Sequence, residues 1–305
     1  MISKRFRRGL EISIEGLPDQ SMIASPEIRS VTLFGADYRG LRADVLVKEN
    51  ERVLVGSALF ADRKRPEIKV ASPVSGRIEE ISIGARRQLA SITIECEAAD
   101  PIEFETSERN IRKLLCETGL WARMVARPFG SVPDPAGRPE ALFVSAIDTA
   151  PGAPDLSIII RNEMEAFARG LEALADLTEG PVFLCVGPDL QDIPELKRVQ
   201  PVEVTGLHPA GMFGTQIDLV HPLRKGAEIW QVHAQDVIAL GHFLSTGTVT
   251  GTRVVGQCGP GVTTPRLVRV PMGAHLSDML ADNVGEGRWK ALSGPPVGGT
   301  ESAAL

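Results

Sequence analysis

The sequence predicts a multidomain chain that combines α+β and α/β architecture. Three observations indicate this: short β-rich runs fill the first hundred residues, a strand, helix and strand follow a Pro/Gly-rich loop, and two strands with a helix come last. With 305 residues, the chain is also too long for one ordinary core. We expect domains over 1–105, 106–250 and 251–293, followed by a polar, mobile tail over 294–305.

The first domain is predicted to be all β, with its strands separated by Gly, Pro or charged turns. The expected strands cover 31–34, 53–60, 68–71, 77–83 and 91–96.

Residues 45–80 have the layout of a biotinyl/lipoyl-like β-hammerhead. In such domains the lysine that carries the prosthetic group precedes an S/A-P-x-x-G turn by seven residues, and the turn here begins at Ser72. Arg65 occupies that place, and Lys64 is one residue off. Because side chains alternate in direction along a strand, this slip points Lys64 to the other face. We therefore expect a carrier fold used as a structural part.

The second domain is predicted to hold a Rossmann-like βαβ unit. A connecting helix is expected over 108–117, with Ser107 as its N-cap. Continuous apolar runs at 141–146 and 181–186 are typical of buried strands. Between them Met164, Phe167, Leu171 and Leu174 recur at helical spacing. Strand, crossover helix and strand predict a parallel sheet.

The remaining elements follow from shorter patterns. We expect strands over 216–220 and 229–233 and a helix over 234–244. A small unit comes last, with strands over 253–257 and 266–270, a Gly-Pro-Gly turn between them and a helix over 276–282. Its size suits a β-grasp module.

The composition excludes several function classes. A net charge of −6 argues against binding of nucleic acid, because there is no basic surplus to replace phosphate counterions. The sequence has neither a membrane-spanning apolar run nor a secretory signal, so we expect a cytoplasmic chain. Its four cysteines form no C-x-x-C, which predicts reduced, mostly buried thiols and no metal site.

No recognised catalytic motif occurs. The sequence lacks G-x-G-x-x-G, the P-loop, G-x-S-x-G and H-E-x-x-H, so we expect no catalytic residue in this chain. The loop over 208–215 mixes two glycines with a histidine and a hydroxyl group. This composition suits a ligand cleft, and a plain turn is the alternative. Our candidate cleft residues lie in this loop and after the 141–146 strand: Asp148, Thr149, His208, Gly211 and Gly214.

The N-terminus carries a basic cluster: Lys4, Arg5, Arg7 and Arg8. Such a cluster contacts an anionic membrane surface or an acidic partner, or else it is a solvated tail.

The chain resembles the A subunit of the Na+-translocating NADH:quinone oxidoreductase (Na+-NQR) from about residue 8 to 298. The resemblance depends on the order and spacing of many short segments, each weak alone. They are 8–10, 14–16, 72–76, 118–121, 127–129, 144–149, 177–180, 208–215, 235–241, 252–255, 259–260 and 265–269.

The resemblance implies a biotinyl/lipoyl-like domain, a Rossmann-like domain and a soluble-ligand-binding β-grasp (SLBB) module. It also implies a peripheral location on the cytoplasmic side of the bacterial inner membrane, with docking chiefly on the membrane-embedded B subunit. In this family NADH oxidation, FAD, FMN, riboflavin, iron–sulfur and sodium movement belong to other subunits, whereas the A subunit is linked to ubiquinone. The resemblance thus implies a chain that binds no cofactor, is structural or quinone-binding, and contributes to reduction of ubisemiquinone to ubiquinol.

The chain is also similar to the flavin-bearing subunit of respiratory complex I and to the C subunit of the Rnf complex. Those relatives bind FMN and NADH at a glycine-rich loop, whose place here is 119–130. There Trp121, Arg123 and Met124 would fill the space that glycines leave, which implies a vestigial nucleotide site. The chain ends at Leu305, whereas members of this family usually continue into a helical region.

Three alternatives remain open at the level of sequence. They are a flavin- and NADH-binding electron-entry subunit, a carrier lipoylated or biotinylated at Lys64, and a general ligand-binding module that uses the β-grasp unit.

Overall fold

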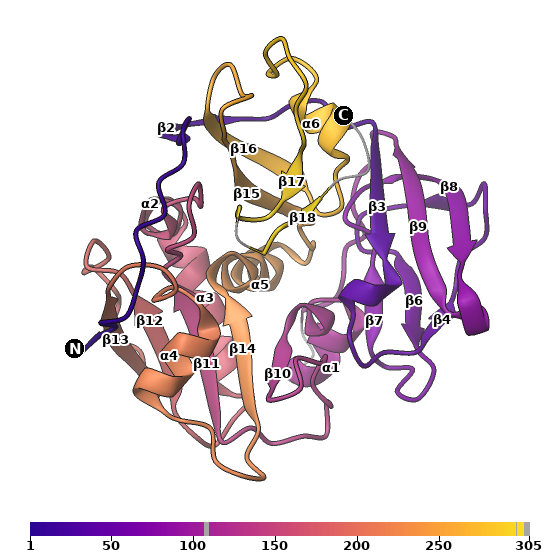
Figure 1. Ribbon diagram of the computed structural model, residues 1–305. Coiled ribbons are helices and arrows are strands. Elements are labelled where there is room, and N and C mark those ends of the chain that lie inside the picture. Colours follow the sequence, from indigo (N-terminus) through magenta and orange to yellow (C-terminus); the bar gives the residue numbers. More distant parts are fainter. Residues whose placement is uncertain (107–109, 297, 302–305) are drawn as a thin grey trace.

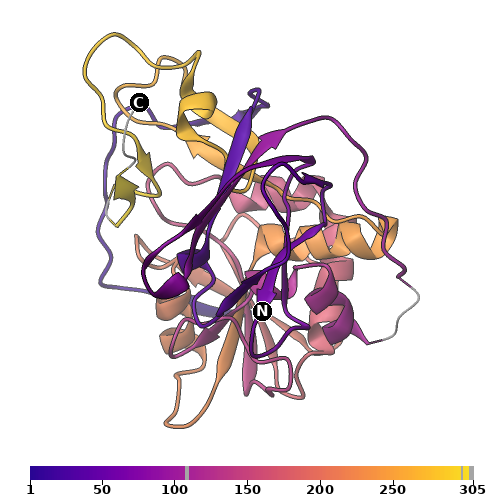
Figure 2. The ribbon, with the colours of Figure 1, turned by 90° about the vertical axis from the view of Figure 1, so that its right-hand side faces the viewer.

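Three groups of strands surround one central helix, α5 (Ala234–Thr246), in the computed structural model (Figure 1). The structure describes residues 1–106, 110–296 and 298–301. In Figure 1 the β-rich domain lies on the right, the α/β domain on the left and below, and the small C-terminal module at the top. Figure 2 shows the molecule from the side of the β-rich domain.

Two facing sheets form the β-rich domain. One has the order β3-β9-β8-β5, and the other has the order β4-β6-β7. Their bounds are β3 (Ser30–Phe34), β4 (Ala43–Val45), β5 (Arg52–Val53), β6 (Ala58–Asp62), β7 (Lys69–Ala71), β8 (Gly76–Ile83) and β9 (Leu89–Cys96).

Alternation along these strands fills the space between the sheets. Ile92 and Ile94 of β9 are fully buried, and Ile78 of β8 and Phe60 of β6 join them in the core. One detail of the prediction was wrong: the stretch 53–60 is two strands separated by a turn, in which Ser57 N–H donates to Leu54 O at 2.9 Å.

The α/β domain is built on a six-stranded sheet of order β1-β13-β12-β11-β14-β10. All neighbouring strands are parallel except β10, which runs antiparallel to β14. The bounds are β1 (Ile2–Arg5), β10 (Val125–Arg127), β11 (Ala141–Ala146), β12 (Val182–Val186), β13 (Val199–Thr205) and β14 (Ile229–His233). Its other helices are α1 (Ile111–Glu117), α2 (Leu156–Asn162), α3 (Met164–Ala175) and α4 (Phe213–Val220).

Both faces of this sheet are covered, which explains the continuous apolar runs. On β11, Leu142 packs in the cluster formed with α3 and α5, whereas Phe143 packs in a second cluster with Ile217 of α4. The predicted parallel βαβ unit is confirmed, since β11 pairs in parallel with β12 across the α2–α3 crossover.

Two predictions in this domain were wrong. The stretch expected as a strand over 216–220 belongs to helix α4, because Phe213, Ile217 and Val220 at helical spacing cover an open sheet face. Helix α1 begins at Ile111, where the Asn110 side chain accepts from Lys113 N–H at 3.3 Å. The predicted N-cap, Ser107, lies outside the described residues.

The C-terminal module is a three-stranded sheet of order β15-β16-β2. Its elements are β2 (Asp19–Ala24), β15 (Thr252–Gln257), β16 (Arg266–Pro271) and α6 (Leu276–Leu280). A hairpin of β17 (Leu292–Ser293) and β18 (Thr300–Glu301) follows, within a stretch for which the sequence predicted no element. The mobility of 294–305 stays a prediction.

The N-terminal segment ties the domains together. It runs along the left side of Figure 1, and it supplies β1 to the edge of the α/β sheet and β2 to the C-terminal sheet. Neither strand pairs with the β-rich domain to which the sequence assigned residues 1–105, and the predicted domain limits remain predictions. Among the described residues no helix is both long and apolar enough to cross a bilayer.

Candidate functional site

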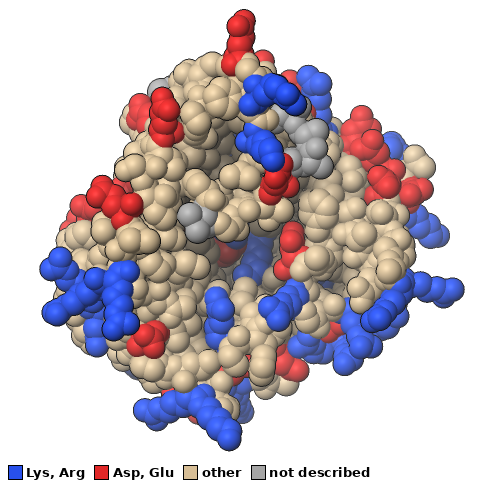
Figure 3. Space-filling view, viewed as in Figure 1, with Lys and Arg blue, Asp and Glu red and all other residues tan. Residues whose placement is uncertain are grey.

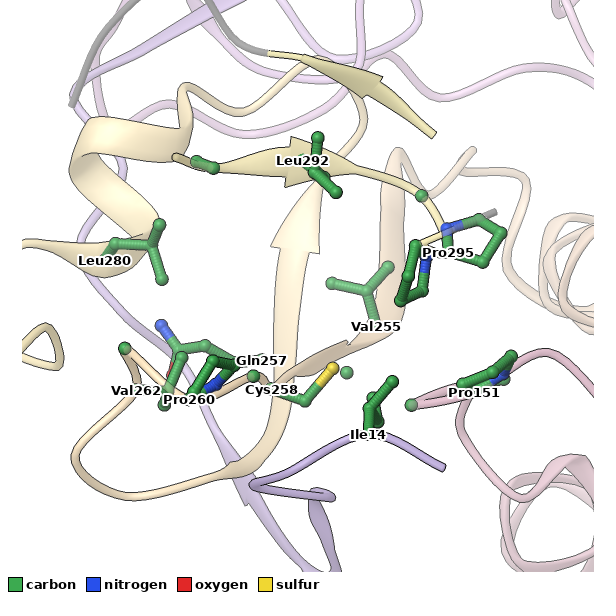
Figure 4. Close-up of a pocket in the computed structure, with 18 of the residues that line it drawn as sticks. Ile14, Pro151, Val255, Gln257, Cys258, Pro260, Val262, Leu280, Leu292 and Pro295 are labelled. Carbon is green, nitrogen blue, oxygen red and sulfur yellow. The ribbon is translucent and has the colours of Figure 1, made fainter. Parts of the chain in front are cut away.

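A cavity of about 600 Å³ lies between the C-terminal module and the α/β domain (Figure 4). Four separate parts of the chain line it: the N-terminal segment, the loop after β11, the β15 and α6 region, and the start of the β17–β18 hairpin. Most of its wall is apolar, with Ile14, Pro151, Val255, Leu280 and Leu292 among the residues drawn in Figure 4.

The wall has few polar groups, and hydrogen bonds hold the side chain of one of them, Gln257, in place. Gln257 is buried, and its side-chain carbonyl accepts from Asn283 Nδ2 at 2.6 Å and from Arg266 Nε at 3.0 Å. Burial raises the pKa of the Cys258 thiol, which keeps it neutral at ordinary pH. Such a wall suits a mainly apolar ligand with few polar atoms.

A salt bridge fastens the hairpin that closes one side of the cavity. Lys290 Nζ lies 2.8 Å from Glu301 Oε1, and this hydrogen bond raises the pKa of Lys290. The pair joins the start of the hairpin to its last strand.

The structure brings four of the five predicted cleft residues together. Thr149 Oγ1 accepts from Gly211 N–H at 2.8 Å and lies 3.3 Å from His208 Nδ1. A side chain at Gly211 would place its Cβ 2.4 Å from the backbone nitrogen of Thr149, so the two loops are in close contact. Of these four, Asp148 lines the cavity, whereas Thr149, His208 and Gly211 do not line it. Gly214 lies in α4 with open space around it. Their role in ligand binding stays a prediction.

The sequence analysis missed Gln216, which is fully buried behind these loops. Its Nε2 donates to Ser145 Oγ at 2.7 Å and to Gly211 O at 3.1 Å, while its Oε1 has no partner among the described residues. No sequence signal separates this glutamine from an exposed one, because its burial depends on α4 packing over the sheet.

A second buried cluster lies where β11 and β14 end, at the point where the strand order reverses. In parallel sheets this is the usual place for ligands, and a helix N-terminus there often binds phosphate. Here Asp236, in the first turn of α5, occupies that end of the helix. Arg253 Nη2 donates to both of its oxygens, at 2.7 and 2.6 Å, and Arg123 Nη1 lies 3.7 Å from Oδ1.

Charge pairing decides the ionisation of this cluster. Burial alone would raise the pKa of Asp236, but Arg253 and Arg123 lower it below its usual range. Burial, with Arg253 nearby, lowers the pKa of His233. The neutral ring caps α5, since His233 Nδ1 accepts from Gln235 N–H at 3.2 Å.

Comparison with known proteins matches this chain along its length. Three family models match: "NqrA N-terminal barrel-sandwich hybrid domain" over residues 5–97, "NqrA second alpha/beta domain" over 106–249, and "NQRA C-terminal domain" over 254–304. The A subunit of the Na(+)-translocating NADH-quinone reductase of Yersinia pestis is 38% identical over 311 residues, covering 98% of this chain and 69% of that protein. The chain belongs to this NqrA family.

Other relatives carry the same name. Those of Cellvibrio japonicus and of Pseudomonas aeruginosa strain UCBPP-PA14 are each 37% identical and cover 98% and 97% of this chain, which spans 69% and 68% of their lengths. A solved NAD+-reducing [NiFe]-hydrogenase overlaps 56% of this chain and 39% of its own, with 16% identity and a TM-score of 0.39, too distant to support an inference. The predicted fold class, a biotinyl/lipoyl-like β domain, a Rossmann-like α/β domain and an SLBB module, is confirmed, since models of a barrel-sandwich hybrid domain, an α/β domain and the C-terminal domain match in that order.

In this NqrA homologue, the stretch 119–130 contributes several large side chains to the core. Trp121 is fully buried, its indole N–H donates to Pro133 O at 2.9 Å, and it packs edge-to-face on Trp230 with ring centroids 5.3 Å apart. The Arg112 guanidinium lies over both rings, 5.8 and 5.2 Å from their centroids. Met124 is buried as well.

The tip of the β6–β7 hairpin, which holds Lys64 and Arg65, contacts the α/β domain. Arg65 Nε lies 2.9 Å from Asp62 Oδ2, and its Nη1 lies 3.6 Å from Asp134 of the α/β domain. Lys64 is exposed on the same tip. Arg65 therefore joins the two domains.

All four cysteines are unpaired thiols, Cys116 and Cys185 being buried and Cys96 and Cys258 half-buried. Within the described residues, no cluster of His, Cys, Asp and Glu has the arrangement of a metal site.

Proposed function

We propose that this chain is a peripheral, non-catalytic component of a Na+-translocating NADH:ubiquinone oxidoreductase that binds quinone and carries no cofactor of its own. It would contribute to the reduction of ubisemiquinone to ubiquinol coupled to Na+ export. NADH oxidation and the FAD, FMN, riboflavin and iron–sulfur groups would belong to the other subunits. Membership of the NqrA family, combined with the apolar cavity, carries this proposal.

The cavity supports quinone as the ligand class. A quinone has a flat ring, two carbonyl oxygens and an apolar tail, and a mainly apolar cavity of about 600 Å³ lies within the size range of small-molecule sites. Asp148, one of the predicted cleft residues, lies on its wall. The opening between two domains is also a common position for ligand sites.

Two features support the cofactor-free part of the proposal. The N-terminal end of α5, where a phosphate would lie, holds the Asp236 carboxylate. The segment that is glycine-rich in flavin-binding relatives contributes Trp121 to the core.

Titration of the purified chain with ubiquinone-1 tests the quinone part. Trp289 lines the cavity, so its fluorescence should fall as quinone binds, and Trp289→Phe should remove this signal. Val255→Phe should weaken binding at least tenfold, because the larger ring occupies the cavity. The control is Leu46→Phe, an exposed site on the β-rich domain. Equal loss in both variants, or no saturable binding, would contradict quinone binding here.

Equilibrium dialysis with FMN and with NADH tests the cofactor-free part. We expect no stoichiometric binding of either at micromolar concentration. Tight binding would favour the electron-entry alternative, and a mass increase of lipoyl or biotinyl size at Lys64 in native material would favour the carrier alternative.

Capture from native membranes tests the assembly. The tagged chain should co-purify with the other subunits of the complex, chiefly the membrane-embedded B subunit, and recovery of the chain alone would contradict the assignment.

A further inference from the structure

The basic cluster at the N-terminus lies on an open edge of the molecule. Strand β1 is an edge strand of the six-stranded sheet. Four cations lie in it or just after it: Lys4, Arg5, Arg7 and Arg8. Figure 3 shows Lys and Arg side chains gathered on this side of the molecule, at the left. Within the described chain, none of the four forms an ion pair.

Nearby carboxylates do not cancel this charge. Glu11 follows in the chain, and Glu203 of β13 accepts a hydrogen bond from Ser3 Oγ at 2.9 Å. Four cations against these two carboxylates leave a positive edge on a chain whose net charge is −6.

Apolar side chains are exposed beside the cations. Leu10 is 71% exposed, Met212 55% and Leu207 49%. They belong to one surface, because Leu10 N–H donates to His208 O at 2.9 Å and so aligns the N-terminal segment with the loop after β13. We call these residues and the four cations the basic-apolar patch: Lys4, Arg5, Arg7, Arg8, Leu10, Leu207 and Met212.

A small depression of about 320 Å³ lies within the patch, lined by Arg5, Phe6, Arg7, Gly9, Gly206 and Leu207. Close backbone contacts hold its shape. A Cβ on Gly206 would lie 2.5 Å from Phe6 O, and one on Gly9 would lie 2.7 Å from Leu207 Cβ. Two guanidinium groups at such a depression match the charge and geometry of a phosphate group.

We propose that the basic-apolar patch binds the surface of an anionic bilayer. A phospholipid phosphate would lie between Arg5 and Arg7, and the exposed Leu and Met side chains would enter the headgroup region. The inference deepens the proposed function, since it describes how a peripheral chain meets its membrane. A protein partner is less well matched, because the exposed apolar side chains of the patch are aliphatic, and Phe6 of the depression packs against the core of the α/β domain.

Flotation of the full chain with vesicles tests this proposal. Vesicles of phosphatidylcholine with about one-third phosphatidylglycerol should bind the chain, and pure phosphatidylcholine should not. Each basic residue near an anionic surface contributes roughly fivefold in binding, so Arg7→Gln/Arg8→Gln should weaken binding roughly 25-fold. The charge-matched control is Arg224→Gln/Lys225→Gln, both exposed on the loop after α4.

A second pair of variants tests the apolar part without a change of charge. Leu10→Ser/Met212→Ser should weaken vesicle binding roughly tenfold, whereas Leu46→Ser/Ile83→Ser, at comparably exposed sites on the β-rich domain, should not. Circular dichroism melting checks that every variant is folded.

Three outcomes would overturn the proposal. They are equal binding to both kinds of vesicle, equal loss in the control variants, and patch variants that bind vesicles normally but no longer capture the detergent-solubilised sister subunits. Vesicle binding needs neither quinone nor sister subunits, so its failure would leave the quinone titration unaffected, and failure of that titration would leave the vesicle result standing.

Discussion

At the scale of single residues, the carboxylate of Asp236 at the start of α5 joins parts of two domains through ion pairs. Asp236 belongs to the α/β domain, Arg253 to the C-terminal module, and Arg123 to the segment that precedes β10. Arg123 Nη2 also donates to Thr250 O at 3.0 Å. Two partly buried cations thus share one carboxylate that is almost fully buried.

We expect Asp236→Asn to lower the free energy of unfolding by about 3 kcal/mol, because two partly buried guanidinium groups then lack their counter-charge. Urea denaturation at pH 7 measures this. The control is Glu179→Gln, which breaks the fully exposed pair with Arg138 and should cost less than about 1 kcal/mol. A similar cost for both variants would show that the cluster contributes no more than a surface pair.

His233 predicts a dependence of stability on pH. Burial lowers its pKa in the folded chain below the ordinary value of 6.5, so around and below pH 6.5 the unfolded chain binds a proton that the folded chain does not. The neutral His233 ring therefore contributes fully to the free energy of unfolding above pH 6.5, and this contribution is lost as the pH falls towards the pKa of His233 in the folded chain. His233→Asn keeps a capping acceptor but does not titrate, so its unfolding free energy should change less between about pH 7.5 and 5.5. Parallel curves for the two proteins would contradict this.

At the scale of elements, the packing of α3 on α5 depends on two glycines. A Cβ on Gly241 of α5 would lie 1.7 Å from Ala166 O, and one on Gly170 of α3 would lie 2.1 Å from Val237 O. The helices therefore approach each other more closely than any larger residue permits at these positions. The N-terminus of α5, and with it Asp236, lies at the carboxyl end of β14.

Two helical glycines should respond oppositely to alanine. Gly241→Ala should destabilise the chain by about 2 kcal/mol or more, because the helices must separate, although alanine favours helix by about 1 kcal/mol. Gly214→Ala in α4 meets nothing within 4 Å and should stabilise by up to about 1 kcal/mol. Thermal unfolding of both variants measures this, and destabilisation by Gly214→Ala would contradict the packing described for α4.

At the scale of the whole molecule, the first 24 residues act as a strap across two domains. β1 extends the α/β sheet and β2 extends the C-terminal sheet, where Asp19 N–H donates to Pro265 O at 3.1 Å. Residues 14 and 15 of the same segment line the cavity. The shape of the cavity therefore depends on the position of this N-terminal segment.

A chain that begins at residue 26 should lose protection from hydrogen exchange in β13 and β16, because each loses a neighbouring strand. Exchange in β3 and β9 of the β-rich domain should not change. Unchanged protection of β16 would show that the β15–β16 pair is stable without β2.

The local patterns of the sequence identify much of this fold. β11 spans 141–146 as predicted, because an apolar run covered on both faces carries its own signal, and α5 extends only two residues past the predicted end. The eight residues of α4 were misassigned in part, because a short amphipathic run also suits a strand. For the site, sequence reasoning found Asp148 but not Ile14, Val255 or Leu292, which are far apart in the chain.

The sequence by itself determined the family, the order of domains and the presence of large residues at 121, 123 and 124, because motifs, periodicity and side-chain size are all local properties. Only the tertiary structure decided where β1 and β2 pair, that Arg253 and Arg123 share Asp236, and that four distant segments enclose one cavity. These depend on contacts between residues widely separated in the chain, and local patterns carry no information about which such residues meet.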